Sequence, residues 1–230
     1  MTKDKKNNQA DNLTEVESAL TKTEQFLESN QKLISIVIGS IVIVVVGYLA
    51  LNKFYLEPRD QEAKDQMYVA QNYFEKDSFN LALNGDGGNL GFLDIIDDFG
   101  STDAGNLAKY YAGVSYLQMG QFEDAIEYLQ KFKTKDILLK PISIGAQGDA
   151  QLELGKTDKA IDLYTKAYKL NENELTTPIY MLKAAELLES TGKSAEALKI
   201  YETIKQKFPE SNEGRNIDKY IARAKVKANS

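Results

Sequence analysis

The strongest hydrophobic pattern in the chain is an uninterrupted apolar run from Leu33 to Leu51, flanked by Lys32 and Lys53. Its nineteen residues include no charged side chain. As a helix the run is about 28 Å long, close to the thickness of the hydrocarbon core of a membrane. A buried core helix rarely continues so far without a polar face, and a cleaved signal peptide starts earlier and ends in small residues. The pattern therefore predicts a transmembrane helix over 33–51.

The basic residues around this span indicate its orientation. Residues 1–32 carry five lysines, whereas 52–64 carry three basic side chains. Because short cytoplasmic segments are enriched in Lys and Arg, this favours a cytoplasmic N-terminal tail over 1–32 and an exported C-terminal domain. Within the tail, apolar residues at helical spacing in 12–29 predict a short amphipathic helix. It either lies on the bilayer, contacts a partner or is merely solvated.

After the span, residues 57–230 show helical spacing almost throughout, and no stretch alternates apolar and polar residues for long enough to predict a strand. Three segments within this region align with one another: 112–132, 147–167 and 184–204. They repeat at intervals of 35 and 37 residues. Such a period is typical of stacked helical hairpins. The expected fold class is therefore all-α: a transmembrane helix followed by a right-handed α-solenoid.

Each aligned segment carries the same small residues, and their spacing resembles the tetratricopeptide repeat (TPR). A small residue precedes a turn glycine by seven positions, and an alanine follows that glycine by five. Small side chains let two antiparallel helices approach closely, and the glycine adopts the left-handed conformation that ends a helix. The predicted packing residues are Gly113, Gly120, Ala125, Gly148, Gly155, Ala160, Ala185, Gly192 and Ala197.

The three clear repeats are expected at about 104–139, 141–173 and 177–209, with a terminal capping helix over 212–227. A degenerate repeat over about 61–100 precedes them. Its helices are expected at Gln61–Phe79 and Leu90–Phe99. A cap of this kind covers the apolar face that the last hairpin of a solenoid otherwise exposes.

The stretch "LNGDGGNLGF" joins the two helices of the degenerate repeat. Its glycines miss the dinucleotide-binding spacing by one position, no lysine follows for a phosphate loop, and its acidic residues are too few for a calcium loop. We expect a long turn that permits positive φ, and a loss of stability when Gly85, Gly87 and Gly88 are replaced by alanine. A second expectation is that the loop forms a mobile edge of the solenoid that contacts a partner near the bilayer.

Composition narrows the chemistry. The chain has no cysteine, histidine or tryptophan, which excludes a thiolate nucleophile, a disulfide, a Cys/His zinc site and a histidine base. Asp94, Asp97 and Asp98 fit the polar face of an amphipathic helix better than a carboxylate pair. A net charge of −6 argues against nucleic acid as a partner. We expect no catalytic residue, metal or cofactor.

The concave groove formed by the first helices of the repeats is the predicted partner site. The repeat pattern assigns to it Leu107, Tyr110, Val114, Leu117, Gln118, Ile142, Gly145, Asp149, Leu152, Glu153, Ile179, Leu182, Glu186, Glu189 and Ser190. This mixture of apolar and acidic residues suits an apolar helix or extended segment with basic flanks. The alternative is that these residues pack against neighbouring helices. On the terminal helix, Arg215, Lys219 and Arg223 form a stripe for an acidic partner or lipid, or merely complement the helix dipole.

Three stretches, "LALNGDGGNLGFLDII", "TDAGNLAKYYAGVSYLQMGQFEDAIEYLQKF" and "TTPIYMLKAAELLESTGKSAEALKIYETI", together with this layout, resemble the YfgM-like family of bacterial inner-membrane proteins. The resemblance implies a periplasmic solenoid and an ancillary subunit of the Sec translocon. It also implies that the protein pairs with a membrane-anchored periplasmic chaperone of the prolyl-isomerase type. A further implied contact is with exported polypeptides. Function is then binding rather than catalysis. The alternatives are an envelope assembly scaffold for outer-membrane or cell-division machinery, a cytoplasm-facing sensor, or an enzyme.

Overall fold

The computed structural model describes residues 26–228, and every regular element in that range is helical. The chain divides into two compact units at the boundary between Leu56 and Glu57. The first unit contains α2 (Gln31–Leu51) and the π-helical turn η1 (Asn52–Leu56). Most of the amphipathic helix predicted over 12–29 lies outside the described residues.

The first unit exposes its apolar side chains. None of the residues of α2 is buried, and Ile43 and Val44 are 74% and 70% exposed. Ser40, a polar residue within the helix, donates its hydroxyl to the Ile36 carbonyl at 2.8 Å. By length and composition, the helix that begins at Gln31 is the one candidate for a membrane crossing among the described residues.

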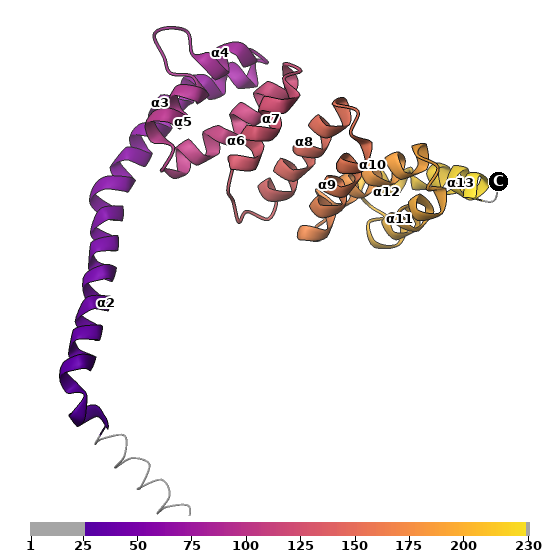
Figure 1. Ribbon diagram of the computed structural model, residues 1–230. Helices are drawn as coiled ribbons and strands as arrows, with labels where there is room; N and C mark the ends of the chain where they lie inside the picture. Colours follow the sequence, from indigo (N-terminus) through magenta and orange to yellow (C-terminus); the bar gives the residue numbers. More distant parts are fainter. Residues whose placement is uncertain (1–25, 229–230) are drawn as a thin grey trace, which may run out of the picture. The chain divides into compact units, whose positions relative to one another are not determined.

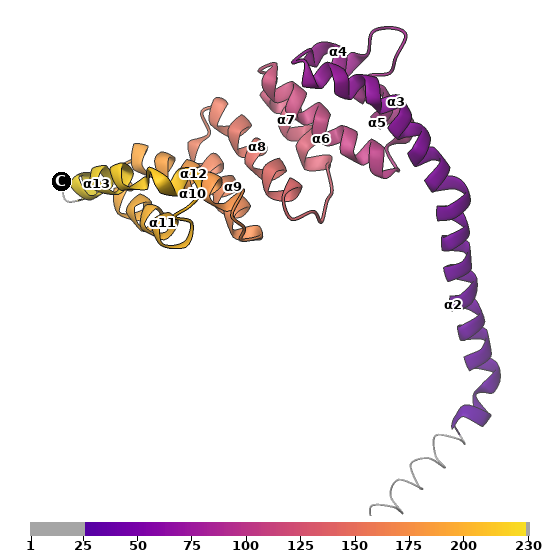
Figure 2. The same ribbon diagram turned by 180° about the vertical axis from the view of Figure 1, so that it is seen from behind.

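The second unit is a series of antiparallel helices in which each packs on the next (Figures 1 and 2). It begins with three elements, α3 (Glu57–Glu75), α4 (Phe79–Asn84) and α5 (Phe92–Phe99). Three hairpins follow: α6 (Asp103–Gln118) with α7 (Phe122–Lys131), α8 (Leu139–Glu153) with α9 (Thr157–Leu170), and α10 (Thr177–Ser190) with α11 (Ser194–Lys207). The unit ends with α12 (Asn212–Arg215) and α13 (Ile217–Ala228).

The hairpins turn at Gly120, Gly155 and Gly192, whose φ angles are 76°, 71° and 83°. This left-handed conformation is strained for residues with a Cβ, and it lets the chain reverse directly after each first helix. Close packing between the paired helices depends on missing side chains. A Cβ on Gly113 would lie 2.6 Å from Leu129 Cγ, and one on Gly148 would lie 2.6 Å from a ring carbon of Tyr164. Four small residues are fully buried at the corresponding contacts: Ala125, Ala160, Ala185 and Ala197.

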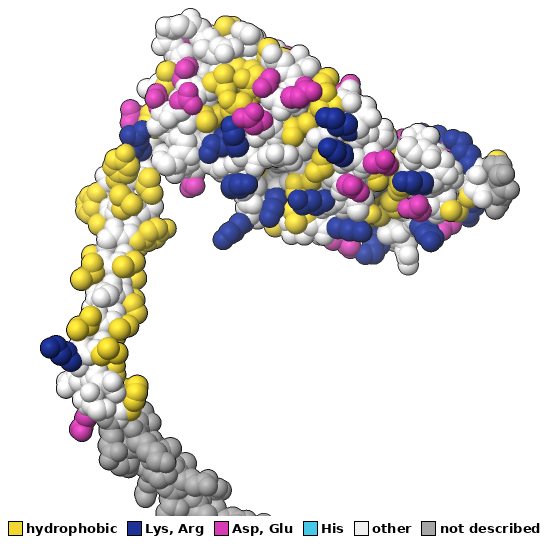
Figure 3. Space-filling view, in the orientation of Figure 1, with side chains coloured by type: hydrophobic (Ala, Val, Ile, Leu, Met, Phe, Trp, Pro, Cys, Tyr) yellow, Lys and Arg dark blue, Asp and Glu magenta, His cyan; other side chains and the backbone are white. Residues whose placement is uncertain are grey.

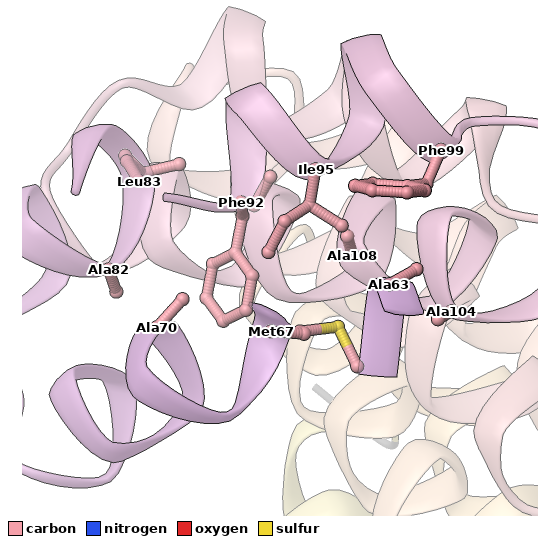
Figure 4. Packing of buried hydrophobic residues seen from close by; sticks show 11 residues of the cluster. Ala63, Met67, Ala70, Ala82, Leu83, Phe92, Ile95, Phe99, Ala104 and Ala108 are labelled. Carbon is pink, nitrogen blue, oxygen red and sulfur yellow. The ribbon is translucent and has the colours of Figure 1, made fainter. Parts of the chain in front are cut away.

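The first three helices of the unit share one apolar core with α6 (Figure 4). Phe92 and Ile95 of α5 are fully buried against Met67 of α3. The Phe92 ring stacks on the Tyr111 ring of α6, with centroids 5.1 Å apart. This packing ties α5 to α3 and to the first helix of the first hairpin.

The helix predicted over Gln61–Phe79 is wrong at its end. The backbone leaves the helix after Glu75, and Asp77 has a φ of 56°, which is unusual for a residue other than glycine. The Ser78 N–H then bonds to the Tyr73 carbonyl, and a separate helix, α4, begins at Phe79. The apolar spacing continues across this break, so that the pattern alone did not reveal it.

The glycine-rich loop after α4 is ordered by Asp86. One carboxylate oxygen accepts the backbone N–H groups of Gly88 and Asn89, at 2.9 and 2.7 Å, and the other accepts the Tyr73 hydroxyl at 2.8 Å. The hydroxyl of Tyr73, first, and then the loop amides hold the pKa of Asp86 well below its usual range. Gly85 and Gly87 have positive φ, but Gly88 does not, contrary to the prediction for that residue.

The C-terminal part of the unit covers the last hairpin. Ile217, Ile221 and Ala224 of α13 are buried in one cluster with Tyr201 and Ile204 of α11. The single helix expected over 212–227 is interrupted at Asn216, which separates α12 from α13.

Candidate partner-binding surfaces

The residues assigned to the groove lie on the first helices of the three hairpins, and all are at least partly exposed except Gly145 and Glu189, which are buried. Leu107, Tyr110, Val114 and Leu117 are on α6, Ile142, Asp149 and Leu152 on α8, and Ile179, Leu182 and Glu186 on α10. Leu107, Leu152 and Leu182 also pack against the buried clusters. For these three residues the packing role is therefore seen directly, and a role in binding stays a prediction.

The acidic residue of the middle repeat has partners inside the solenoid. Asp149 accepts the Tyr164 hydroxyl at 2.5 Å and Lys183 Nζ at 2.6 Å. Burial and this hydrogen bond to a carboxylate raise the pKa of Tyr164 well above its usual value. Lys183 also lies over the Tyr164 ring, 5.4 Å from its centroid. The negative charge of Asp149 is thus compensated within the protein.

Glu189 on α10 is the most enclosed charged side chain of this surface, with 2% of it exposed. It binds Arg223 through two contacts of 2.6 and 2.8 Å, Lys227 at 3.0 Å and the Tyr201 hydroxyl at 3.1 Å. The hydrogen bonds from Arg223 outweigh burial and lower the pKa of Glu189 to about 2. This cluster joins α10 to α13.

The cluster corrects the interpretation of the basic stripe on the terminal helix. Arg223 neither faces solvent alone nor only complements the helix dipole, because its guanidinium is committed to Glu189. The signal for it was present in the sequence. Glu189 and Arg223 are 34 residues apart, as are Asp149 and Lys183, which is the general period of the tetratricopeptide repeat and close to the intervals of 35 and 37 residues in this chain.

A pocket beside α10 contains one of the predicted groove residues, Ile179. Its volume is about 660 Å³, and its apolar lining consists of Leu175, Ile179 and Pro209. The Leu175 side chain is 64% exposed. Three carboxylates lie in the same wall: Glu174, Glu210 and Glu213. The lysine of the pocket, Lys207, pairs with Glu172 at 2.8 Å. Apolar surface beside acidic groups is suited to an apolar segment that carries basic residues.

The arrangement offers little to a reacting group. Within residues 26–228, no three acidic side chains converge in a way that could hold a metal ion. Asp94, Asp97 and Asp98 lie on exposed positions of α5, and Asp94 accepts the Gly91 N–H at its helix start, at 3.1 Å.

Two segments match sequence models of the tetratricopeptide repeat, residues 107–136 and 146–212. Together they include most of the three hairpins. No curated protein is significantly similar to the chain.

Among solved structures, this chain is similar in fold to the TPR-like repeats of a candidate kinesin light chain from Podosopora anserina. Two crystal structures of those repeats, one of them of a point variant, align with a TM-score of 0.56 each at 15% and 16% identity. Each alignment covers 74% of this chain and 88% of the other. Similarity at this identity concerns the fold alone.

Proposed function

Because this chain is built of tetratricopeptide repeats, we propose that it is a non-enzymatic scaffold that binds protein partners through its solenoid. The observation that carries the proposal is the surface along α6, α8 and α10. Apolar residues there stay partly exposed on helices that bury other side chains in the packed interior. At Ile179 this surface adjoins the acidic pocket, which favours an apolar partner segment with basic flanks.

We further propose that residues 33–51 anchor the scaffold in a bacterial inner membrane. The support is the exposure of the whole apolar surface of α2, which a core helix would bury. The excess of lysine before the span favours a cytoplasmic N-terminus, so that the solenoid is periplasmic.

The partners we propose are the Sec translocon, a membrane-anchored periplasmic chaperone of the prolyl-isomerase type and exported polypeptides. The support is the sequence resemblance to the YfgM-like family, together with exposed apolar positions suited to unfolded chains. In this role the protein assists export and folding of secreted proteins. The second candidate, an envelope assembly scaffold, uses the same surface for a different client.

Site-specific photo-crosslinking in native membranes tests the proposal. A photoreactive amino acid is placed at Tyr110 or Ile179, with Lys199, an exposed residue of α11, as the control position. We expect the translocon channel and a periplasmic chaperone among the products from the first two positions, and not from Lys199. Products that contain outer-membrane assembly or division proteins instead would favour the second candidate.

Protease accessibility tests the orientation separately. In spheroplasts with an intact inner membrane, externally added protease should degrade the solenoid and leave a short N-terminal fragment. Protection of the solenoid would place it in the cytoplasm and contradict the periplasmic partners.

A further inference from the structure

A second pocket, of about 620 Å³, lies where α7, α8 and α9 meet, and it contains none of the predicted groove residues. Its lining is dominated by four lysines, Lys133, Lys135, Lys140 and Lys166. No carboxylate belongs to the lining. The pocket is therefore positively charged, although the chain as a whole has a net charge of −6. Figure 3 shows Lys and Arg side chains gathered along the lower edge of this part of the solenoid.

The floor of the pocket is apolar and is formed by residues of the packed interior. Leu129, Phe132 and Ile144 are at most 8% exposed, so they form part of the packed interior while lining the recess. Side-chain amides and hydroxyls stand beside them, from Gln130, Thr134, Ser143 and Gln147. These groups can hydrogen-bond a peptide backbone, while the floor receives an apolar side chain.

The loop that carries Lys133 and Lys135 is held in place. Asn106 of α6 donates to the Lys133 carbonyl at 2.7 Å and accepts the Lys133 N–H at 3.0 Å. The adjacent Phe132 ring packs on Tyr110, with centroids 5.5 Å apart. A loop fixed at its backbone in this way presents its charges at lower entropic cost than a flexible one.

The carboxylate of the same loop does not neutralise the lysines. Asp136 accepts the backbone N–H groups of Leu138 and Leu139, both at 2.8 Å, at the start of α8. These bonds lower the pKa of Asp136. Lys133 donates to the Gln130 carbonyl at 3.0 Å. Among the described residues, Lys135, Lys140 and Lys166 form no ion pair.

We propose that this basic pocket binds an acidic segment of a partner protein, with Asp or Glu over the lysines and an apolar side chain on the floor. The inference rests on the proposed scaffold function but uses a different surface and the opposite charge. The apolar floor and the amides distinguish a peptide from a lipid headgroup, which would occupy only the lysines. The negative charge of the whole chain opposes nucleic acid.

The test uses the full-length protein in detergent and a fluorescent peptide that alternates glutamate with leucine, followed by fluorescence anisotropy. A comparison peptide of the same length carries lysine in place of each glutamate. The variant Lys135→Glu/Lys140→Glu reverses two charges of the pocket. Its matched control is Lys76→Glu/Lys199→Glu, which makes the same charge change at exposed residues outside the pocket. We expect the pocket variant to weaken binding of the acidic peptide by about tenfold or more, and the control variant by less than about twofold.

A single variant, Lys166→Glu on α9, tests the same pocket without touching the loop, and its affinity should fall as well. Equal losses in the pocket and control variants would overturn the proposal. So would a loss of lysine-peptide binding in the pocket variant as large as its loss of acidic-peptide binding. The same proteins are incubated with phosphatidylglycerol vesicles. If the pocket variant lowers vesicle binding and leaves peptide binding unchanged, the pocket is a lipid site and the proposal is wrong. Crosslinking from Ile179, which lies outside this pocket, proceeds independently, so failure here leaves the proposed function standing.

Discussion

At the scale of single residues, the carboxylate of Glu189 joins α10 to α13 through several charged and hydrogen-bonded contacts. It is almost fully enclosed and receives Arg223, Lys227 and Tyr201. The variant Glu189→Gln removes the negative charge and keeps the shape of the side chain. The guanidinium of Arg223 is then left without its carboxylate partner. Because Arg223 is half exposed, we expect a loss of only about 1–3 kcal/mol in the free energy of unfolding. Denaturant unfolding of the full-length protein in detergent measures it.

The matched control is Glu186→Gln, the same change at an exposed position one turn earlier on α10. It should alter the free energy of unfolding by no more than about 0.5 kcal/mol. Similar losses in both variants would show that the cluster around Glu189 contributes nothing specific.

The lowered pKa of Glu189 predicts how stability depends on pH. The pKa is about 2 in the folded protein, against an ordinary value of 4.5, so that the unfolded chain binds the proton more readily. The stabilisation by Glu189 is therefore complete above about pH 4.5 and is lost as the pH falls towards 2. Unfolding measured over this range should show the wild-type protein losing its advantage over Glu189→Gln. A difference that stays constant with pH would contradict the assignment.

The glycines of the loop after α4 should differ sharply when each is replaced by alanine. Gly85 has positive φ, and its Cβ would lie 2.2 Å from the Asn89 carbonyl oxygen, so Gly85→Ala should cost about 2–4 kcal/mol. Gly87 has positive φ in open space, which predicts about 1 kcal/mol. Gly88 has neither constraint and should change stability by less than about 0.5 kcal/mol. Thermal unfolding of the three variants gives the ranking, and a Gly88→Ala loss equal to that of Gly85→Ala would refute it.

At the scale of elements, two ion pairs, each between residues 34 positions apart, explain how α13 ends the solenoid. Asp149 of α8 reaches Lys183 on the first helix of the next hairpin. Glu189 of α10 reaches Arg223 on α13, at the same separation of 34 residues. In both cases a buried tyrosine of the second helix donates to the same carboxylate. The terminal helix thus occupies the place of the first helix of a further repeat.

This role predicts that α13 protects its neighbours only. Ile221 is 8% exposed and packs into the last cluster. Ile221→Asp places a charge there and should cost about 3 kcal/mol or more, while the adjacent Ala222→Asp, on an exposed position, serves as control. Hydrogen exchange should show faster exchange in α10 and α11, with α3 to α6 unchanged, because repeats are stabilised by their nearest neighbours. Uniform loss of protection along the solenoid would contradict this expectation.

The hairpins were predictable from sequence because their determinants are local and periodic. Gly120, Gly155 and Gly192 mark the turns by spacing alone, and all three have the left-handed conformation. The end of α3 was not predictable, since apolar spacing runs across the break and Asp77 adopts positive φ without being glycine. The basic pocket was missed for another reason. Asn106 fixes the loop from 27 residues away, and no pattern in the sequence records that contact.

At the scale of the whole molecule, charge is divided along the solenoid. Residues 57–110 carry eleven acidic and four basic side chains, whereas 131–169 carry eight lysines and five acidic side chains. An acidic partner is repelled by the first stretch and attracted to the second, so the basic pocket lies where the long-range field favours it. An apolar partner with basic flanks is instead attracted to the acidic pocket at Ile179. The two surfaces therefore discriminate between partners by sign as well as by shape.

The anchor is the remaining prediction at this scale, and its rival is a cleaved signal sequence near the N-terminus. A protein with a different epitope tag at each end separates the two, because cleavage removes the N-terminal tag. We expect one species that carries both tags and stays in the membrane pellet after alkaline extraction. Ile43→Lys/Val44→Lys places two charges at the centre of α2, at a cost of about 3 kcal/mol each, and should release the protein to the supernatant.

The control pair is Asp65→Lys/Gln66→Lys, which adds lysines on exposed positions of α3, outside the apolar run, and should leave the protein in the pellet. If the N-terminal tag is lost from the wild-type protein, α2 is a processed leader and the solenoid is released. If the double lysine variant in α2 stays in the membrane as firmly as the wild type, retention depends on partners of the solenoid. Because both outcomes are read from the same extraction, anchoring by α2 is tested independently of what the solenoid binds.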